Sequence, residues 1–233
     1  MANPIAAYSF DAGTGATIAD DSGNSRTLTV ASGSYTGSGH TSAGFQNTGG
    51  TAVTGASGTV TAVSGSTCSV MGWVKPFALP ASGVHLAFGA MQAGGNTDFG
   101  IYTQRGDFGT SNVLQGDARI GGSLIAANGA ALTVGTWAHL ALTFDGTNLK
   151  LYKDGSLVTT TVNAGSLANT GTLYVAGHAS AGTAAVTVDD VRYFSTDESA
   201  NITTWMNTPV TPLGASLPPV RTGYKRYQHM LVR

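Results

Sequence analysis

Short segments rich in β-branched and aromatic residues recur along most of this chain, and glycine-rich turns separate them. The pattern is typical of strands that place one face on a core and the other in water. Charged residues make up 10% of the 233 residues, against roughly 25% in an ordinary globular domain. This composition argues against a coiled coil, a helical bundle and a strongly charged disordered chain. We therefore expect an all-β protein.

The pattern predicts eleven strands, which is enough for a sandwich or a barrel. They are expected at residues 5–10, 27–31, 67–76, 84–91, 99–104, 113–120, 137–144, 148–153, 156–162, 172–177 and 186–194. The clearest alternation lies at 137–144, and the pairs Asp145-Gly146 and Asp154-Gly155 follow it. Asp-Gly is a strong hairpin signal because glycine adopts a positive φ at little cost. Residues 137–162 are therefore predicted to form a three-stranded meander.

One helix is predicted near residues 196–207. The tetrapeptide at 195–198, Ser-Thr-Asp-Glu, fits a capping box, in which the serine oxygen accepts a first-turn N–H and the glutamate reaches back. Ile202, Trp205 and Met206 would then cover one edge of the sandwich.

The composition changes after this helix. Four of the seven prolines fall within residues 209–219. Proline lacks the N–H and disfavours helix in the residue before it, so this stretch is expected to be extended. We expect one domain at residues 1–207 and an extended, proline-rich arm at 208–233.

Charge is divided unevenly between domain and arm. Residues 1–207 contain seven basic and twelve acidic side chains, whereas residues 208–233 contain four basic and no acidic ones. A negatively charged domain does not attract a phosphate backbone, so we expect no nucleic acid on the domain. The arm could contact an acidic protein or a nucleic acid. The single cysteine, Cys68, excludes an intrachain disulfide.

Targeting signals are absent from the pattern. No apolar run approaches the roughly 18 residues of a membrane span. The first ten residues lack the basic and apolar regions of a signal peptide. We expect no membrane contact, and either a mature chain or one that leaves its cell by another route, such as assembly into a virus particle.

Catalytic constellations are scarce in this sequence. Glycosidases usually need two carboxylates about 5 to 10 Å apart, but Glu198 is the single glutamate and most aspartates sit in turn contexts. The five histidines show no metal-binding spacing, and the nucleophile, dinucleotide and phosphate-loop motifs are missing. We expect a protein that is not an enzyme.

Two acidic clusters suggest a hard cation. Asp20-Asp21-Ser22-Gly23-Asn24 lies near the start of the domain and Asp189-Asp190 near its end. Oxygen ligands from such a turn and a distant strand suit Ca²⁺. The alternative is a polar turn, together with an acid pair that binds backbone amides.

Several motifs in order resemble one family. They are Ala7-Tyr8-Ser9-Phe10-Asp11 with Gly13-Thr14-Gly15, Asp20-Asp21-Ser22-Gly23-Asn24, Met71-Gly72-Trp73-Val74-Lys75-Pro76, Thr136-Trp137-Ala138-His139 with Phe144-Asp145-Gly146, Leu151-Tyr152-Lys153-Asp154-Gly155, and Val188-Asp189-Asp190-Val191-Arg192-Tyr193. Together they resemble the laminin-G-like, concanavalin A-like jelly-roll domains over residues 5–206. The resemblance implies a two-sheet antiparallel jelly-roll sandwich, often non-catalytic, that binds glycans or proteins. It also implies a structural Ca²⁺ near Asp20, Asn24, Asp189 and Asp190.

Aromatic residues divide into two expected groups. Trp73 and Trp137 each lie in an apolar strand and are expected in the core. A sugar needs an exposed ring to stack on, and Tyr35, Tyr102 and Phe108 lie in polar, glycine-rich surroundings. The alternative for these three is a rim aromatic half-buried under a loop.

Freestanding domains of this family also resemble minor tail and head-decoration proteins of tailed bacteriophages. Our first hypothesis is therefore a virion structural protein that displays a glycan-binding jelly roll on the virion surface. It would attach to phage capsid or tail proteins through residues 208–233, with Arg221, Tyr224, Lys225, Arg226 and Tyr227 as anchors. The alternative for the arm is a disordered end.

Other functions stay open. One is a carbohydrate-binding module of a secreted glycanase or adhesin, which would be extracellular. Another is a glycan hydrolase or lyase that uses aspartates. The sequence does not decide between a monomer and a homo-oligomer.

Overall fold

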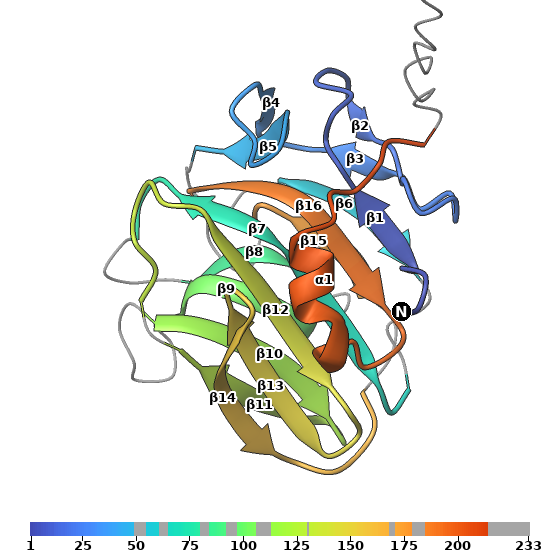
Figure 1. The fold of residues 1–233 in the computed structure, drawn as a ribbon, viewed down its shortest axis with the longest axis vertical. Coiled ribbons are helices and arrows are strands. Elements are labelled where there is room, and N and C mark those ends of the chain that lie inside the picture. The colour runs from blue at the N-terminus through green and yellow to red at the C-terminus, as the bar shows by residue number, and fades with distance from the viewer. Residues whose placement is uncertain are drawn as a thin grey trace, which may run out of the picture.

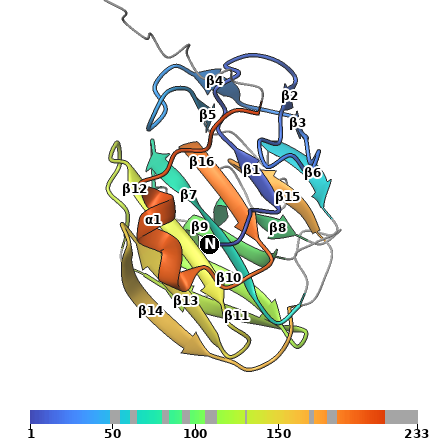
Figure 2. The same ribbon diagram turned by 45° about the vertical axis from the view of Figure 1, so that its right-hand side comes forward.

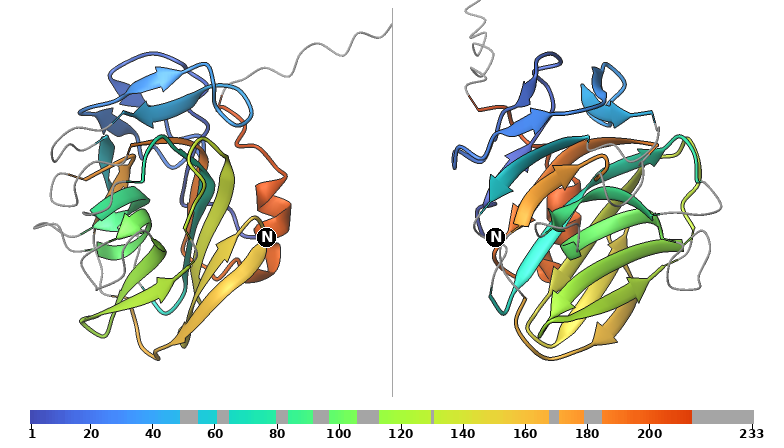
Figure 3. Two further views of the ribbon diagram at one scale, coloured as in Figure 1. Left: turned by 90° about the vertical axis from the view of Figure 1, so that its left-hand side faces the viewer. Right: turned by 180° about the vertical axis from the view of Figure 1, so that it is seen from behind.

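The computed structural model describes residues 1–48, 55–60, 65–79, 84–91, 97–105, 113–129, 131–167, 171–178 and 185–213. Two antiparallel sheets of eight strands each lie face to face, and a short helix lies outside one of them (Figure 1). The left view of Figure 3 shows the two layers from the side. The predicted all-β jelly-roll sandwich with one short C-terminal helix is confirmed.

Sheet A has β16 among its interior strands. Its order is β14 (Ser156–Val162), β13 (Asn148–Lys153), β12 (Ala138–Phe144), β7 (Cys68–Pro76), β16 (Val186–Phe194), β5 (Gly44–Asn47) and β4 (Ser34–Thr36). A further strand, β1 (Ala6–Tyr8), pairs with residues 191–193 of β16, while β5 pairs with residues 186–188. The predicted meander over 137–162 is present as β12, β13 and β14.

Sheet B forms the second layer. Its order is β11 (Ser123–Asn128), β10 (Val113–Ile120), β9 (Thr97–Arg105), β8 (Val84–Met91), β15 (Gly171–Val175), β6 (Ala56–Val60), β3 (Leu28–Val30) and β2 (Thr17–Ile18).

The core fills the space between the two sheets. Val74, Leu142 and Leu114 belong to one buried apolar cluster that contains residues of both layers. The sheets approach closely at Gly116, where an added Cβ would lie 2.3 Å from Leu142 Cδ1. Alternate residues of each strand therefore face this core, and the residues between them face outward.

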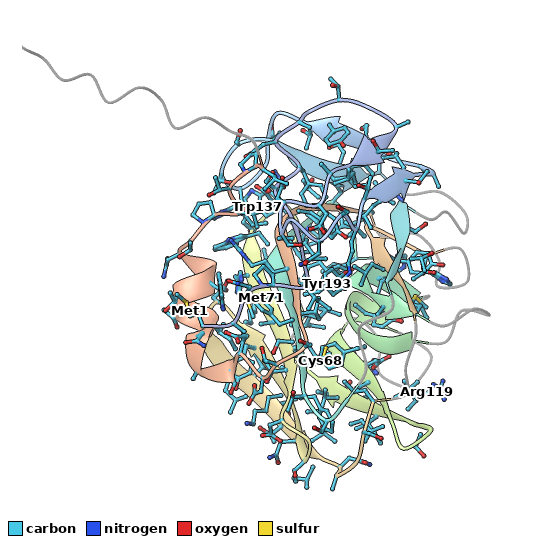
Figure 4. The ribbon with its side chains drawn as sticks, turned by 90° about the vertical axis from the view of Figure 1, so that its right-hand side faces the viewer. Met1, Cys68, Met71, Arg119, Trp137 and Tyr193 are labelled. Atoms are coloured by element: carbon cyan, nitrogen blue, oxygen red, sulfur yellow. The ribbon has the colours of Figure 1, made fainter. Side chains whose placement is uncertain are left out.

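The outer face of sheet A is covered in part by a helical segment. A 3₁₀ turn (η1, Ser199–Asn201) leads into α1 (Ile202–Met206). Ile202 is buried against Met71 and Phe194, and Trp205 packs on the same group. Figure 4 shows Met71 on the side of α1, with Cys68 and Tyr193 between the two sheets. The helix thus covers a face, whereas the sequence predicted an edge.

The predicted capping box does not form. Glu198 precedes the 3₁₀ turn without a side-chain capping bond, and the regular helix begins at residue 202. The Glu198 carboxylate instead accepts hydrogen bonds from Trp205 Nε1 at 2.9 Å and from the Ala2 backbone nitrogen at 3.2 Å. Tertiary partners therefore take the side chain that the local motif assigned to the helix start.

All eleven predicted strands are present, with ends within two residues of the expected ones, but β2, β4, β5, β6 and β11 were not predicted. Four of these five have two to five residues, too few to show a period. The fifth, β11, follows Gly121-Gly122, where both φ angles are positive. That glycine pair between two strand-like runs is a hairpin signal that could have located β11.

A bulge in β16 shapes the molecule near its C-terminus. The register between β16 and β7 shifts between Asp189 and Arg192, and Asp190 has a φ of +51°. Asp189 pairs with Trp73 and shares its outward face. After α1 the chain turns back across sheet A toward β1, as Figure 2 shows.

Candidate functional site

A hollow of about 190 Å³ lies among residues next to β2 and β4. These two strands lie at one end of the molecule (Figure 2). It is lined by Ser9, Phe10, Asp11, Ala12, Ile18, Ala19, Asp21, Tyr35, Pro212 and Leu213. Tyr35, one of the three predicted glycan-binding aromatics, lies in its wall and is half-buried. We name this feature the Tyr35 hollow.

The ring of Tyr35 is held rigidly. Tyr35 pairs with Phe45 in the ladder between β4 and β5, and the two rings meet edge to face with centroids 5.8 Å apart. Its hydroxyl donates to the backbone oxygen of Thr17 at 2.7 Å. The ring of Phe10 also stacks on that of Phe45, with centroids 6.1 Å apart. The ring is therefore fixed by packing and by one hydrogen bond, so that little of its motion remains to be lost on binding.

Two carboxylates share the hollow with this ring. Asp21 accepts hydrogen bonds from the backbone nitrogens of Ser9 and Leu213, each at 2.9 Å and each on a different oxygen. Asp11 accepts one from the Ala43 nitrogen at 3.1 Å through Oδ1. Within the described part of the chain, Asp11 Oδ2 has no hydrogen-bond partner. An ionised carboxylate is an acceptor only, so this oxygen suits a hydroxyl donor.

Residues 208–213 dock on the domain, and two of them, Pro212 and Leu213, form the remaining wall of the hollow. The Val210 nitrogen donates to Asp190 Oδ1 at 2.7 Å, the Arg192 guanidinium donates to the Thr208 backbone oxygen, and Leu213 is bound to Asp21. The start of the predicted arm is thus part of the hollow. The arm residues Arg221, Tyr224, Lys225, Arg226 and Tyr227 lie outside the described residues.

The predicted calcium ligands of the first turn serve the backbone in this structure. Asp20 accepts hydrogen bonds from the nitrogens of Ala7, Ser22 and Arg26. Burial raises the pKa of Asp20, but a hydrogen bond from the Ser22 side chain and those from the three backbone nitrogens outweigh it and leave the pKa below its ordinary value. The Asn24 amide is exposed and donates to backbone oxygens of the N-terminal segment.

The second predicted acid pair is buried. Asp189 and Asp190 are 0% and 2% exposed. Asp189 Oδ2 accepts from the nitrogens of His40 at 2.7 Å and Thr41 at 3.1 Å. Burial and the neighbouring Asp190 raise the pKa of Asp189 to about 7, and burial also raises the pKa of Asp190. The pair anchors two surface segments, the loop at His40 and the segment at Val210.

These four residues do not offer a set of free oxygen ligands. The three carboxylates are engaged by N–H or O–H donors. Among the residues with described positions, no group of three or more His, Cys, Asp or Glu could hold a metal ion. This arrangement matches the alternative of a polar turn and backbone-binding acids. The structure does not test calcium binding itself, which stays a prediction from the family resemblance.

One predicted glycan-binding ring is not available. Tyr102 is 1% exposed and packs with Leu86 and Met91 on the outward side of sheet B. The expectation of an exposed ring at this position is wrong, because a strand position in polar surroundings is still buried here by tertiary packing. Phe108 lies outside the described residues.

The two tryptophans expected in the core are also placed differently. Trp73 and Trp137 are half-buried, and Trp73 shares the outward face of sheet A with Asp189 and His139. His40 stacks on Trp73 with ring centroids 3.5 Å apart. Alternation along β7 contained part of the signal, since Trp73 is two residues from the charged Lys75 and therefore on the same face of the strand.

Comparison with known proteins places this fold in a family. The model of the concanavalin A-like lectin/glucanases superfamily, Laminin_G_3, matches residues 47–201, more than half of the chain. The chain belongs to this superfamily. No curated protein sequence matches it.

Solved structures agree on the fold at low sequence identity. Domain 4 of AbnA, an extracellular GH43 arabinanase from Geobacillus stearothermophilus in complex with arabinotriose, is 19% identical with a TM-score of 0.63; 87% of this chain and 98% of that one are covered. The sialidase of Trypanosoma rangeli in complex with sialic acid is 17% identical with a TM-score of 0.64, over 88% of this chain and 33% of the sialidase. The binding domain of botulinum neurotoxin DC in complex with SialylT is 14% identical with a TM-score of 0.64, over 88% of this chain and 51% of that one.

The Tyr35 hollow is built by parts of the chain outside the family match. All ten lining residues fall before residue 47 or after residue 201. The hollow thus lies between segments on either side of the matched range.

Proposed function

We propose that this protein is a non-enzymatic, carbohydrate-binding domain that holds a sugar unit in the Tyr35 hollow. One observation carries the proposal, namely that one hollow is lined both by the fixed Tyr35 ring and by Asp11, which keeps a free acceptor oxygen. A ring face packs against the apolar face of a sugar, and carboxylates accept hydrogen bonds from its hydroxyls. Pockets for drug-sized ligands measure about 300 to 1,000 Å³. A hollow of about 190 Å³ therefore suits a single unit.

Binding without cleavage follows from how the acids are used. Both oxygens of Asp21 already accept backbone hydrogen bonds. Asp189 and Asp190 are buried away from the hollow's solvent. A glycosidase needs one carboxyl group as acid and a second as nucleophile or base. Asp11 alone retains a free oxygen in the hollow, which is enough to bind but not to form such a pair.

The test replaces the ring. The full chain and its Tyr35→Ala variant are titrated calorimetrically with arabinotriose and a panel of neutral oligosaccharides. We expect the variant to lose at least about tenfold in affinity, which corresponds to roughly 1.4 kcal/mol, because stacking and apolar contact disappear. Tyr152→Ala is the matched control, since Tyr152 is a half-buried tyrosine on the outward side of sheet A.

Equal affinity of Tyr35→Ala and the unmodified chain would place the sugar elsewhere. Binding of none of the panel would reject the hollow as a neutral-sugar site. Release of shorter products from any oligosaccharide, followed by chromatography, would contradict the non-enzymatic part of the proposal.

We also propose that the domain is displayed on a virus particle and held there by residues 208–233. The uneven charge supports this, because the cationic and aromatic residues gather in the arm. The docked segment 208–213 supports the proposal too, since it fixes where the arm leaves the domain.

Among the described residues, no helix has the length and apolar character to span a bilayer.

One observation favours a second candidate, an extracellular carbohydrate-binding module of a glycanase or adhesin. The arabinanase domain is covered over 98% of its length, so a domain of this size occurs as part of a glycanase. Neither candidate changes the proposed sugar site.

Removing residues 214–233 separates the two candidates, because the cut leaves the docked segment and the hollow in place. On a virion, purified particles should contain the full chain and less than about one tenth as much of the truncated chain, measured by mass spectrometry. A module would be missing from particles in both forms. Equal incorporation of the two forms would reject the arm as the anchor.

A further inference from the structure

A second group of rings lies on the outward face of sheet A. Trp73 comes from β7, Trp137 from the residue before β12, and His40 from the loop between β4 and β5. His40 stacks on Trp73 at 3.5 Å and meets Trp137 edge to face at 5.8 Å. His40 is exposed, and both indoles are half-buried. The three rings form a surface patch, and this patch shares no residue with the lining of the Tyr35 hollow.

A lysine stands over this patch. Lys75 Nζ lies 4.9 Å from the ring centroid of Trp137. Val74 pairs with Ala138, so Lys75 and Trp137 are neighbours on adjoining chain segments. Within the described residues, no carboxylate forms an ion pair with Lys75. The Lys75 ammonium group therefore has N–H donors and a positive charge with which it can bind an anionic ligand.

The buried Asp189 carboxylate holds the patch in place, and its burial is unfavourable for the free energy of folding. Asp189 is fully buried and accepts the backbone nitrogens of His40 and Thr41. Taking this carboxylate out of water beside Asp190 is unfavourable. The two hydrogen bonds to Asp189 fix the exposed imidazole of His40 on the indole of Trp73. A binding surface gains from such fixed side chains, because less freedom is lost when a ligand arrives.

We propose that Trp73, His40, Trp137 and Lys75 form a second site, which binds an acidic sugar. The sugar ring packs on His40 and Trp137, and its carboxylate pairs with Lys75. A sialic acid and a uronic acid share this chemistry. The Tyr35 hollow contains carboxylates of its own and disfavours such a ligand. The two sites thus differ in the charge of the sugar that they accept, and this second site stands whether or not the hollow binds a neutral sugar.

The experiment titrates the full chain with 3′-sialyllactose, tri-galacturonate and lactose, followed by calorimetry. We expect at least one of the two acidic sugars to bind at least tenfold more tightly than lactose, and the pair tells which acid is preferred. Lys75→Met keeps the apolar stem, removes the charge and should lower acidic-sugar affinity at least tenfold. Trp137→Ala should do the same, and a thermal melt checks that it is folded.

Two matched variants define the site. Lys153→Met removes a lysine from the same sheet that already lies 3.4 Å from the Asp154 carboxylate, and it should leave the affinity unchanged. Tyr35→Ala should also leave it unchanged. The inference is overturned if neither acidic sugar binds, if lactose binds equally well, or if Lys75→Met binds like the unmodified chain. Loss of binding in Tyr35→Ala would overturn it as well, by moving the acidic sugar to the hollow.

Discussion

Asp189 shows how far a single residue can act through its hydrogen bonds. The sequence presents Asp189-Asp190 as a pair of candidate metal ligands. The residues next to the pair do not indicate which groups hydrogen-bond to these carboxylates. In the folded chain the partners are backbone groups of His40 and Val210. Such contacts depend on the topology of sheet A, so they could not be predicted from spacing along the chain.

The raised pKa of Asp189 has a testable consequence for stability. Its pKa is about 7 in the folded chain against 3.8 ordinarily. Between these values the unfolded chain has released a proton that the folded chain still holds, so this group lowers stability as pH rises from about 4 to 7. Below that window and above it, its contribution is constant. Asp189→Asn removes this dependence.

We therefore expect Asp189→Asn to gain stability relative to the unmodified chain as pH rises, by on the order of 3 kcal/mol between pH 4 and pH 7. Urea unfolding of both proteins at several pH values measures the difference. A difference that is constant with pH would show that Asp189 is ionised throughout in the folded state.

Face assignment explains the errors at the aromatic residues. Alternation in β7 shows that Trp73 and Lys75 share a face, but it does not say which face meets the core. The apolar character of the strand suggested the core for Trp73. The partner sheet decides the matter, because the inward positions are those opposite sheet B. Tyr102 fails for the related reason that an outward position can still be buried.

At the scale of elements, long strands with a clear period could be predicted and short ones could not. β4 and β5 have three and four residues, and each is stabilised by its neighbours in the sheet more than by its own residues. Yet β4 positions Tyr35 in the hollow. The candidate site therefore depends on elements that carry little signal of their own, although Tyr35 itself was a predicted site residue.

The segment 208–213 offers a clean backbone test. Val210→Pro removes the backbone N–H that donates a hydrogen bond to Asp190 Oδ1, with a nitrogen–oxygen distance of 2.7 Å. An unpaired buried acceptor costs about 1 to 3 kcal/mol, so we expect the free energy of unfolding to fall by that amount. Denaturant unfolding measures the change. Thr211→Pro is the control, because no hydrogen bond of the Thr211 nitrogen is present within the described structure.

A result in which both proline variants lose the same stability would point to the shape of the ring and not to the lost hydrogen bond. Val210→Ala then separates the contribution of the side chain, since Val210 is itself buried.

For the whole molecule, the sandwich could be predicted because its signals are local and repeated. Strand patterns, Asp-Gly turns and the order of motifs all lie within the chain itself, and the predicted jelly roll is present. The Tyr35 hollow has no such signal, because it joins residues 9–35 to residues 212–213 across the full length of the domain. Only the folded chain brings these ends together.

The docked C-terminal segment also determines how the protein responds to mechanical force. A pull applied beyond Leu213 reaches Asp21 first and then Asp190 and Arg192 in β16. β16 pairs with β7 on one side and with β5 and β1 on the other. The load is thus shared by ladders on both sides of an interior strand, which resists separation better than a strand paired on one side only.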